Sequence, residues 1–259
     1  MDYFIWNADP LLVSFLGLKI HWYGALFATA ILSGLQVMKH FFQKEKVDVE
    51  LLDNLLMYGV IGIIVGARLV HCFFYEPSYY LSNPLKILAI WEGGLASHGG
   101  GLGLMIAAYL YNKHYNLGYV WLLDRLAIST ALFGFFVRMG NFVNSEIIGI
   151  ETSVPWAVVF ERIDPLPRHP VQLYEALVYL SIFIVLFSTY KLTKIKQASG
   201  ALLGLFLILV FTARIGLEFV KVRQASYGHE FVLSTGQWLS VPFFITGCLL
   251  LAMSFKKFK

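Results

Sequence analysis

Residues 200–219 read GALLGLFLILVFTARIGLEF, and their only charged residues, Arg214 and Glu218, come near the end of the run. A helix needs about 20 apolar residues to cross the roughly 30 Å hydrocarbon core of a membrane. This run is therefore expected to span a membrane. The same reading of the whole chain predicts seven transmembrane helices, at residues 20–38, 55–74, 98–112, 119–137, 172–190, 200–219 and 237–255.

The composition agrees with this pattern. The chain has 259 residues, of which 58% are hydrophobic and 14% are charged, and its mean hydropathy is +0.68. Soluble domains are far less apolar. Seven spans leave no room for a large soluble domain, so the predicted fold is an all-α polytopic membrane protein. The amino terminus lacks the basic region and cleavage site of a signal peptide, so the first span is expected to be retained.

The basic residues predict the orientation. Lysine clusters follow alternate spans, and the positive-inside rule makes those loops cytoplasmic. The amino terminus is then outside and the carboxyl terminus cytoplasmic. Ten of the 13 lysines fall on the cytoplasmic side, whereas six of the seven arginines fall towards the outer side. Arginine suits bidentate contact with phosphate or carboxylate, although pairing with local acids and lipid headgroups is an alternative. The outer arginines are Arg68, Arg138, Arg162, Arg168, Arg214 and Arg223.

Residues 138–169 are the one long stretch that interrupts the hydrophobic pattern. They contain apolar and aromatic residues, including Trp156 and Phe160, which indicate a small folded cap with some strand and argue against disorder. Under the predicted orientation this cap lies at the outer face. It could shape a ligand entrance.

A glycine-rich segment opens the third predicted span. Residues 91–103 read WEGGLASHGGGLG and hold six glycines and one histidine, His98. Glycine lets a backbone approach a ligand closely, and a helix start attracts anions. Helix packing through small residues explains the glycines equally directly. Histidine is the side chain best suited to moving a proton near neutral pH.

A polar stretch follows the fourth predicted span. Residues 138–149 read RMGNFVNSEIIG, in which Arg138 and Glu146 supply opposite charges and Asn141 supplies an amide. Such groups at membrane depth are costly unless they are paired or functional. A purely structural polar plug remains an alternative.

Three weaker signals accompany these stretches. Arg214 and Glu218 are four residues apart, so an intrahelical ion pair explains them. Residues 168–176 read RHPVQLYEA, where polar residues recur every third position and predict either a lined cavity or interhelical hydrogen bonds. Tyr23 opens the first span, where aromatic residues usually anchor a helix at the interface.

Taken together and in this order, the stretches resemble the bacterial prolipoprotein diacylglyceryl transferase family. The resemblance runs from Tyr23 to residues 236–240, nearly the whole chain. It implies that the diacylglyceryl group of phosphatidylglycerol is moved to the lipobox cysteine thiol of a preprolipoprotein. A thioether forms and glycerol phosphate is released, at the outer face of the bacterial cytoplasmic (inner) membrane. The implied partners are phosphatidylglycerol, lipobox segments and membrane lipid, with no nucleic acid.

The resemblance also implies the site. We expect His98, Arg138, Arg214 and Tyr23 to act in catalysis, with no metal and no cofactor. The residues expected to bind phosphatidylglycerol are Arg138, Asn141, Glu146, Gly149, Arg214 and Glu218. Departures from the family pattern include Ser145, where glycine is frequent, and Lys221, where a further arginine is common and a peripheral phosphate contact is at stake.

The mechanistic hypothesis assigns roles by chemistry. Arg138 and Arg214 hold the phosphate, with Glu146 and Glu218 orienting them. His98 accepts the thiol proton, and Tyr23 and Asn141 position the headgroup, although an arginine acting indirectly on the thiol is an alternative. The rival from another class is an anion or lipid transporter. An intramembrane serine protease using Ser97 and His98 is a poorer third, because adjacent residues rarely face one another.

Overall fold

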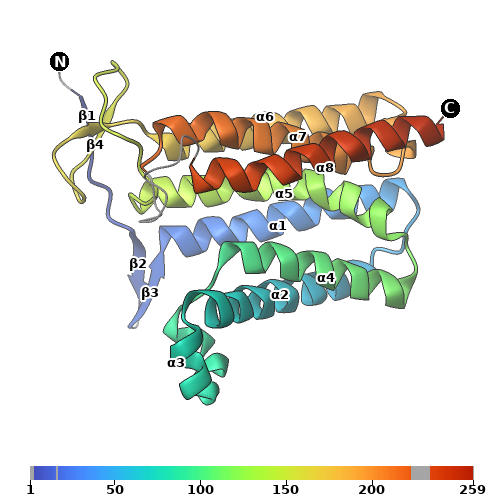
Figure 1. Ribbon diagram of the computed structural model, residues 1–259, viewed down its shortest axis with the longest axis horizontal. Coiled ribbons are helices and arrows are strands. Elements are labelled where there is room, and N and C mark those ends of the chain that lie inside the picture. The colour runs from blue at the N-terminus through green and yellow to red at the C-terminus, as the bar shows by residue number, and fades with distance from the viewer. Residues whose placement is uncertain (1–2, 16, 223–233, 259) are drawn as a thin grey trace. The chain divides into compact units, whose positions relative to one another are not determined.

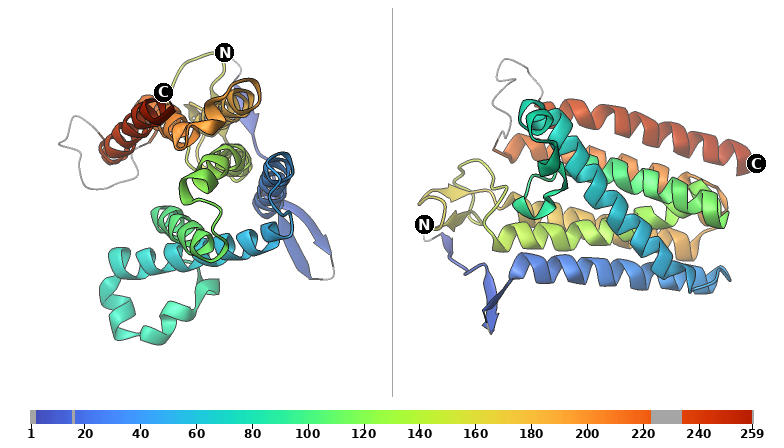
Figure 2. Two further views of the ribbon diagram at one scale, coloured as in Figure 1. Left: turned by 90° about the vertical axis from the view of Figure 1, so that its right-hand side faces the viewer. Right: turned by 90° about the horizontal axis from the view of Figure 1, so that it is seen from below.

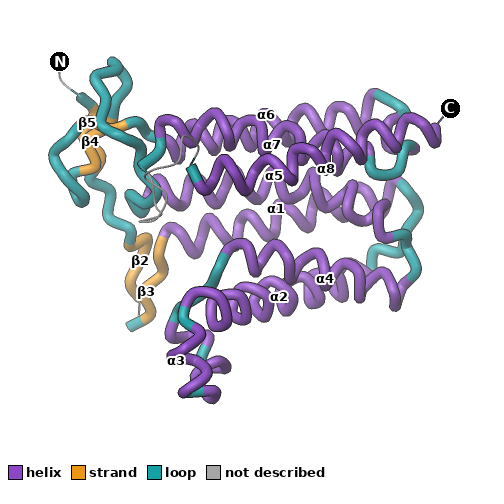
Figure 3. Tube along the Cα trace, in the orientation of Figure 1, coloured by secondary structure: helices purple, strands orange, loops and turns teal. Residues whose placement is uncertain are grey.

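The structure, a computed structural model, describes residues 3–15, 17–222 and 234–258 (Figures 1 and 3). Arg223, one of the expected outer arginines, lies outside these residues. The α-helices of the described part are α1 Trp22–Lys44, α2 Leu51–Val70, α3 Pro77–Ser82, α4 Ser97–Tyr115, α5 Tyr119–Val143, α6 Val171–Leu192, α7 Ala201–Leu217 and α8 Thr235–Phe258. The strands are β1 Phe4–Trp6, β2 Leu11–Phe15, β3 Leu18–His21, β4 Val158–Phe160 and β5 Pro167–Arg168.

An α-helix covers most of each of the seven ranges expected to span the membrane, although residues 20–21 of the first range belong to β3. Within the described residues, six helices are long and apolar enough to do so, and α4 is not among them. Its sequence explains this result, since it opens on Ser97-His98 and three glycines and ends with Asn112, Lys113 and His114. The multi-pass helical fold is thereby confirmed, and the count of seven spans stays a prediction.

The chain divides into two compact units, residues 1–38 with 124–259 and residues 39–123. In the first unit, α5, α6, α7 and α8 lie side by side with their axes roughly aligned, as Figures 1 and 2 show. The loop between α6 and α7 is short, and a short loop makes the two helices it joins antiparallel neighbours. This packing brings the carboxyl end of α5, the start of α6 and the end of α7 together.

The predicted cap contains strand, as expected. β1 pairs in parallel with β4, and β4 pairs antiparallel with β5. Phe142, Val158 and Phe160 form its buried core, and the Trp6 indole donates a 3.1 Å hydrogen bond to the Phe142 carbonyl. The end of α5 is among the boundaries that differ from the expectation, because the helix continues to Val143, past its expected end at residue 137. The polar side chains beyond residue 137 find side-chain partners, so the change in polarity does not end the helix.

A buried aspartate joins α5 to α7. Asp124 has no exposed surface, and its two carboxylate oxygens each accept a 2.8 Å hydrogen bond, from the backbone N–H of Gly200 and of Leu203. These N–H groups open α7, where no intrahelical partner exists for them. Asp124 therefore caps α7 from a neighbouring helix and satisfies its own burial at the same time.

In the second unit, α2 and α4 pack through glycine. A Cβ atom on Gly103 would overlap the Gly62 carbonyl oxygen and lie 2.8 Å from the carbonyl carbon. One turn earlier, Gly99 meets the Gly66 carbonyl in the same way. Small residues allow transmembrane helices to approach this closely. Packing therefore accounts for these two glycines, whereas Gly101 has open space around its Cβ position.

Arg68 has a structural explanation within the same unit. Its guanidinium, buried at 3% exposure, donates hydrogen bonds to the carbonyl oxygens of Lys86 (2.5 Å), Ile87 (2.9 Å), Gly93 and Gly94 (3.3 Å). These carbonyls belong to the connection between α3 and α4. Arg68 thus ties that connection to α2, and neither an ion pair nor an anion is needed to explain its burial.

Candidate functional site

The predicted residues at the carboxyl end of α5 form a connected polar chain. The Arg138 Nη1 donates to Asn141 Oδ1 at 3.2 Å, and Asn141 Nδ2 donates to Glu146 Oε2 at 3.0 Å. Asn144 Nδ2 donates to the other Glu146 oxygen at 3.2 Å. Arg138 and Asn141 are one helical turn apart on α5, which makes this order of contacts possible. Glu146 thus reaches Arg138 through Asn141 and not directly.

Glu175, at the start of α6, connects two cations. Its Oε2 lies 3.0 Å from Arg138 Nε, and its Oε1 accepts a 3.4 Å hydrogen bond from Lys221 Nζ. Glu175 is 7% exposed and Lys221 is 9% exposed. The contact with Arg138 is an ion pair without the geometry of a hydrogen bond. Opposite charges buried together in this way are costly to separate, because each would be left unpaired.

Neither Glu175 nor Lys221 was among the predicted site residues. The spacing of polar residues in 168–176 did predict interhelical hydrogen bonds or a lined cavity, and the structure shows contacts between helices. Lys221 comes directly after the apolar run of residues 201–220, and its backbone forms a β-bridge with Gly149. Burial lowers the pKa of Lys221, and the nearby Glu175 carboxylate opposes that effect. The resemblance had marked Lys221 only as a departure at a peripheral phosphate contact, and the structure shows its pairing with Glu175.

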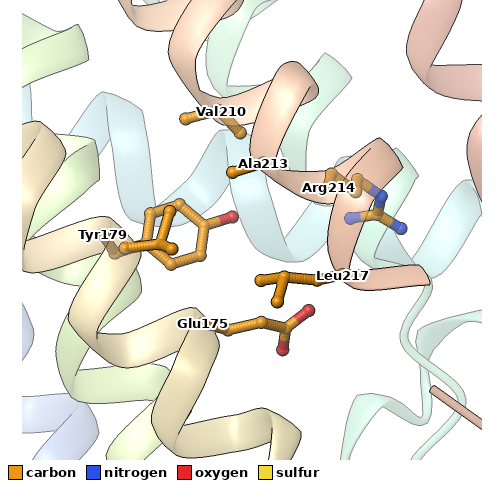
Figure 4. Close-up of a pocket in the computed structure, with 7 residues that line it drawn as sticks. Glu175, Tyr179, Val210, Ala213, Arg214 and Leu217 are labelled. Atoms are coloured by element: carbon orange, nitrogen blue, oxygen red, sulfur yellow. The ribbon is translucent and has the colours of Figure 1, made fainter. Parts of the chain in front are cut away.

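Arg214 lies beside this cluster on α7. Together with Glu175 it lines a small crevice between α6 and α7, whose other residues are Val178, Tyr179, Val210, Ala213 and Leu217. Figure 4 shows the Glu175 carboxylate and the Arg214 guanidinium at one end of the crevice, with Tyr179 and Val210 towards the other. Arg138 on α5 therefore pairs with Glu175, and Arg214 on α7 lines the same crevice as that carboxylate.

The Arg214–Glu218 ion pair expected from helical spacing does not form among the described residues. α7 ends at Leu217, but Glu218 keeps helical backbone angles and its N–H still donates to the Arg214 carbonyl, so the spacing itself would allow the pair. Glu218 Oε1 instead accepts a 3.0 Å hydrogen bond from Ser234 Oγ at the start of α8. The hypothesis that Glu218 orients Arg214 through direct pairing is not supported by this geometry.

Tyr23 lies close to the polar chain. Its ring packs on the Gly140 position, where a Cβ atom would come within 2.9 Å of Tyr23 Cδ2. Gly140 directly precedes Asn141, so the half-buried phenol is held against the part of α5 that carries the site. Tyr23 therefore packs against α5 beside the polar chain, and its predicted role in catalysis stays a prediction.

Gly149 lies between the backbone of His169 and that of Lys221. Its N–H donates to the His169 carbonyl at 3.0 Å, and a Cβ atom at Gly149 would lie 2.5 Å from that oxygen and 2.6 Å from His169 Cβ. Gly149→Ala is expected to destabilise the protein by about 1–3 kcal/mol through overpacking and to reduce transfer activity. Thermal unfolding and an activity assay would measure both effects. Gly216→Ala is the control, because nothing lies within 4 Å of its Cβ position, and equal losses in both variants would contradict the prediction.

Backbone strain surrounds Glu146. Ser145 has φ = 57° and Ile147 has φ = 56°, both in the left-handed region that non-glycine residues rarely adopt. Ser145 is buried, and its hydroxyl oxygen has no hydrogen-bond partner. Ser145→Gly is therefore expected to raise the unfolding free energy by roughly 1 kcal/mol, as judged by the thermal midpoint. An unchanged or lower midpoint would mean that this turn carries no strain that glycine relieves.

Arg168 connects Asp164 in the cap segment to Gly149, one of the predicted site residues, by hydrogen bonds. It donates three hydrogen bonds of 2.6 to 3.1 Å to Asp164 and a further one, of 3.2 Å, to the Gly149 carbonyl. The Arg168 guanidinium lowers the pKa of Asp164. A depressed folded pKa means that the stabilisation is present above the unfolded pKa of about 3.9 and is lost as the pH falls through the folded value.

Asp164→Asn should accordingly lower the thermal midpoint at pH 7 and not at pH 2. The effect is expected to be small, about 0.5–1 kcal/mol, because the pair is partly exposed. Unfolding curves of both proteins between pH 7 and pH 2 would measure it. A difference that persists at pH 2 would show that the ion pair is not its cause.

His98 lies in the second unit, as the second residue of α4. Its backbone is described, while its side chain lies outside the described part of the structure. Its predicted role as proton acceptor therefore stays a prediction.

The fold is that of a multi-pass helical membrane protein, and ionisable residues clustered at the ends of membrane helices mark a functional site in such proteins. Comparison with known proteins specifies the class further. The family model of prolipoprotein diacylglyceryl transferase matches residues 10–253. The chain belongs to this family and is a transferase. This membership decides between the enzyme and the transporter in favour of the enzyme.

Three relatives are named phosphatidylglycerol–prolipoprotein diacylglyceryl transferase. The chain is 54% identical to the protein of Tolumonas auensis over 253 residues, which cover 97% of this chain and 98% of the relative. It is 47% identical to that of Chloroherpeton thalassium, over 99% of this chain and 96% of the relative. It is 41% identical to that of Bacteroides fragilis, over 93% of this chain and 92% of the relative.

Proposed function

We propose that this transferase moves the diacylglyceryl group of phosphatidylglycerol to the lipobox cysteine thiol of a preprolipoprotein. The sulfur forms a bond to the glyceryl carbon, the bond from that carbon to the phosphate oxygen breaks, and glycerol phosphate leaves. The thiol proton passes to a base. The observation that carries this proposal is that Arg138 pairs with the buried Glu175 carboxylate while Arg214, from another helix, lines the same crevice as Glu175.

The arginines would bind the phosphate. Arg138 contacts its protein partners through Nε and Nη1, which leaves its Nη2 side for a ligand. Arg214 supplies a second planar donor from α7. The phosphate diester carries one negative charge, and the departing monoester gains a second. Fixed cations in a water-poor site stabilise that added charge most when it develops in the transition state.

The other predicted residues complete the proposal. His98 accepts the thiol proton, and Tyr23 and Asn141 donate hydrogen bonds to the headgroup. Glu146 holds Asn141, and thereby Arg138, through the polar chain described above. The residues proposed to contact or border the lipid headgroup are Tyr23, Arg138, Asn141, Glu146, Gly149, Arg214 and Glu218.

The proposed setting is the bacterial cytoplasmic membrane. Residues 1–259 form a single membrane-embedded catalytic domain with seven spans, the amino terminus outside and the carboxyl terminus cytoplasmic. The lysine distribution supports this orientation, and it puts the ends of α5 and α7 that carry the arginines at the outer face. The cap of β4 and β5 then lies outside, over the site.

The test uses the purified protein with phosphatidylglycerol vesicles and a lipobox peptide. A mass gain of one diacylglyceryl group on the peptide, with release of glycerol phosphate, is the expected result. A peptide with serine in place of the lipobox cysteine should gain nothing. The His98→Gln variant tests the base, and transfer at the wild-type rate by that variant would remove His98 from the mechanism.

A further inference from the structure

The first turn of α6 holds the polar chain of α5 at both ends. Gln172, which has no exposed surface, donates a 2.5 Å hydrogen bond from Nε2 to the backbone carbonyl of Glu146. Glu175, three residues further along, pairs with Arg138. Residues three apart lie on one face of a helix. One helix face thus contacts the first and the last members of the chain Arg138–Asn141–Glu146.

We propose that Glu175 is a positioning residue for the transfer reaction, which fixes the direction of the Arg138 guanidinium towards the phosphate. This inference rests on the proposed function, in which Arg138 binds that phosphate. Glu175 would not touch the substrate. It acts through Arg138. The Glu175 carboxylate lies 3.0 Å from Arg138 Nε, while Arg138 Nη1 donates a hydrogen bond to Asn141.

The geometry favours this role because the guanidinium is planar. The hydrogen bond at Nη1 and the ion pair at Nε act on two different atoms of this rigid group, and together they restrict its position and the direction of its remaining donors. Of the two polar contacts that the described residues make with this guanidinium, removing Glu175 would leave the hydrogen bond to Asn141, about which the group could turn. Misplacing a catalytic group by about 1 Å costs up to roughly 10²-fold in rate.

A second explanation of Glu175 must be separated from the first. Lys221 is a buried cation 3.4 Å from Glu175 Oε1, and it needs a counter-charge whatever the reaction. Glu175 could serve that structural need alone. The two roles predict different results when Lys221 is removed as well, which makes a double-mutant cycle decisive.

The experiment measures kcat, KM for phosphatidylglycerol, and the thermal midpoint for the wild type, Glu175→Gln, Lys221→Met and the double variant. If Glu175 positions Arg138, Glu175→Gln should lower kcat/KM by roughly 30-fold, mostly through kcat, within the range that misplacement of a group produces. Glu175→Gln should lower kcat/KM by a similar factor when it is introduced into the Lys221→Met variant. The double variant should nevertheless recover most of the thermal midpoint lost by Glu175→Gln, because the uncompensated charge is gone.

Recovery of kcat/KM in the double variant to the level of Lys221→Met would overturn the proposal, since Glu175 would then only balance Lys221. Glu175→Asp is a second variant, which keeps the charge but draws it back by one methylene group. The positioning role predicts a loss of at least tenfold in kcat for this variant, and wild-type kcat would contradict it. A wild-type protein that fails to transfer would overturn the reaction itself, whereas a transferring wild type matched by Glu175→Gln would overturn only the role of Glu175.

Discussion

Arg138→Ala is expected to lower kcat/KM for diacylglyceryl transfer by about 10³-fold. Loss of one fixed donor that stabilises developing charge costs about 10²–10³-fold in other enzymes, and this variant also removes the closer of the two cations that pair with Glu175 among the described residues. Arg138→Lys keeps a positive charge and loses the planar fork, so we expect a smaller loss of about 10²-fold. Mass spectrometry of the peptide product under initial-rate conditions would measure both variants.

Arg162→Ala is the matched control. Arg162 also lies on the predicted outer side, but its side chain is exposed in the cap segment. Its removal should leave kcat/KM within about twofold of the wild type, as for most surface substitutions. If Arg162→Ala lost as much activity as Arg138→Ala, the effect would come from the general positive charge of the outer side. If neither variant lost activity, Arg138 would have no place in the reaction.

The helices could be predicted from the sequence because hydropathy reports directly on what a membrane requires. Runs such as residues 200–219 have one stable conformation in lipid, a helix that satisfies its own backbone. The pattern is weaker where packing replaces hydropathy, as in α4. Its glycines lower the hydropathy of the segment while permitting the close contact with α2 that stabilises it.

The site could be predicted only in part, because side-chain partners are not encoded by spacing alone. Arg138, Asn141 and Glu146 were recognisable as a polar stretch after an apolar run, and they do contact one another. Arg214 and Glu218 have ideal helical spacing, but the Glu218 carboxylate accepts its hydrogen bond from Ser234, which is distant in sequence. Glu175 had only a weak signal in its repeat of three, and the contact with Arg138 that gives it importance depends on how α6 packs beside α5.

Gly103→Ala is expected to have the largest effect on stability among the glycine variants. The added Cβ would overlap the Gly62 carbonyl oxygen and also lie 3.1 Å from Gly66 Cα, and neither backbone can turn aside as a flexible side chain could. α2 and α4 would have to move apart, at a cost of about 3 kcal/mol or more. The thermal midpoint of the purified protein should fall markedly, and Gly103→Leu should prevent the two helices from packing.

Gly101→Ala, two residues away on the same helix, separates packing from ligand binding as the reason for the glycine-rich segment. Nothing lies within 4 Å of its Cβ position, and alanine favours helix over glycine by about 1 kcal/mol, so this variant should be as stable as the wild type or more so. Helix packing predicts that it also keeps its transfer activity. The opposite result would be a stable Gly101→Ala protein without transfer activity, together with a Gly103→Ala protein whose thermal midpoint equals that of the wild type. It would mean that the segment approaches the lipid or the peptide and that its glycines serve the reaction.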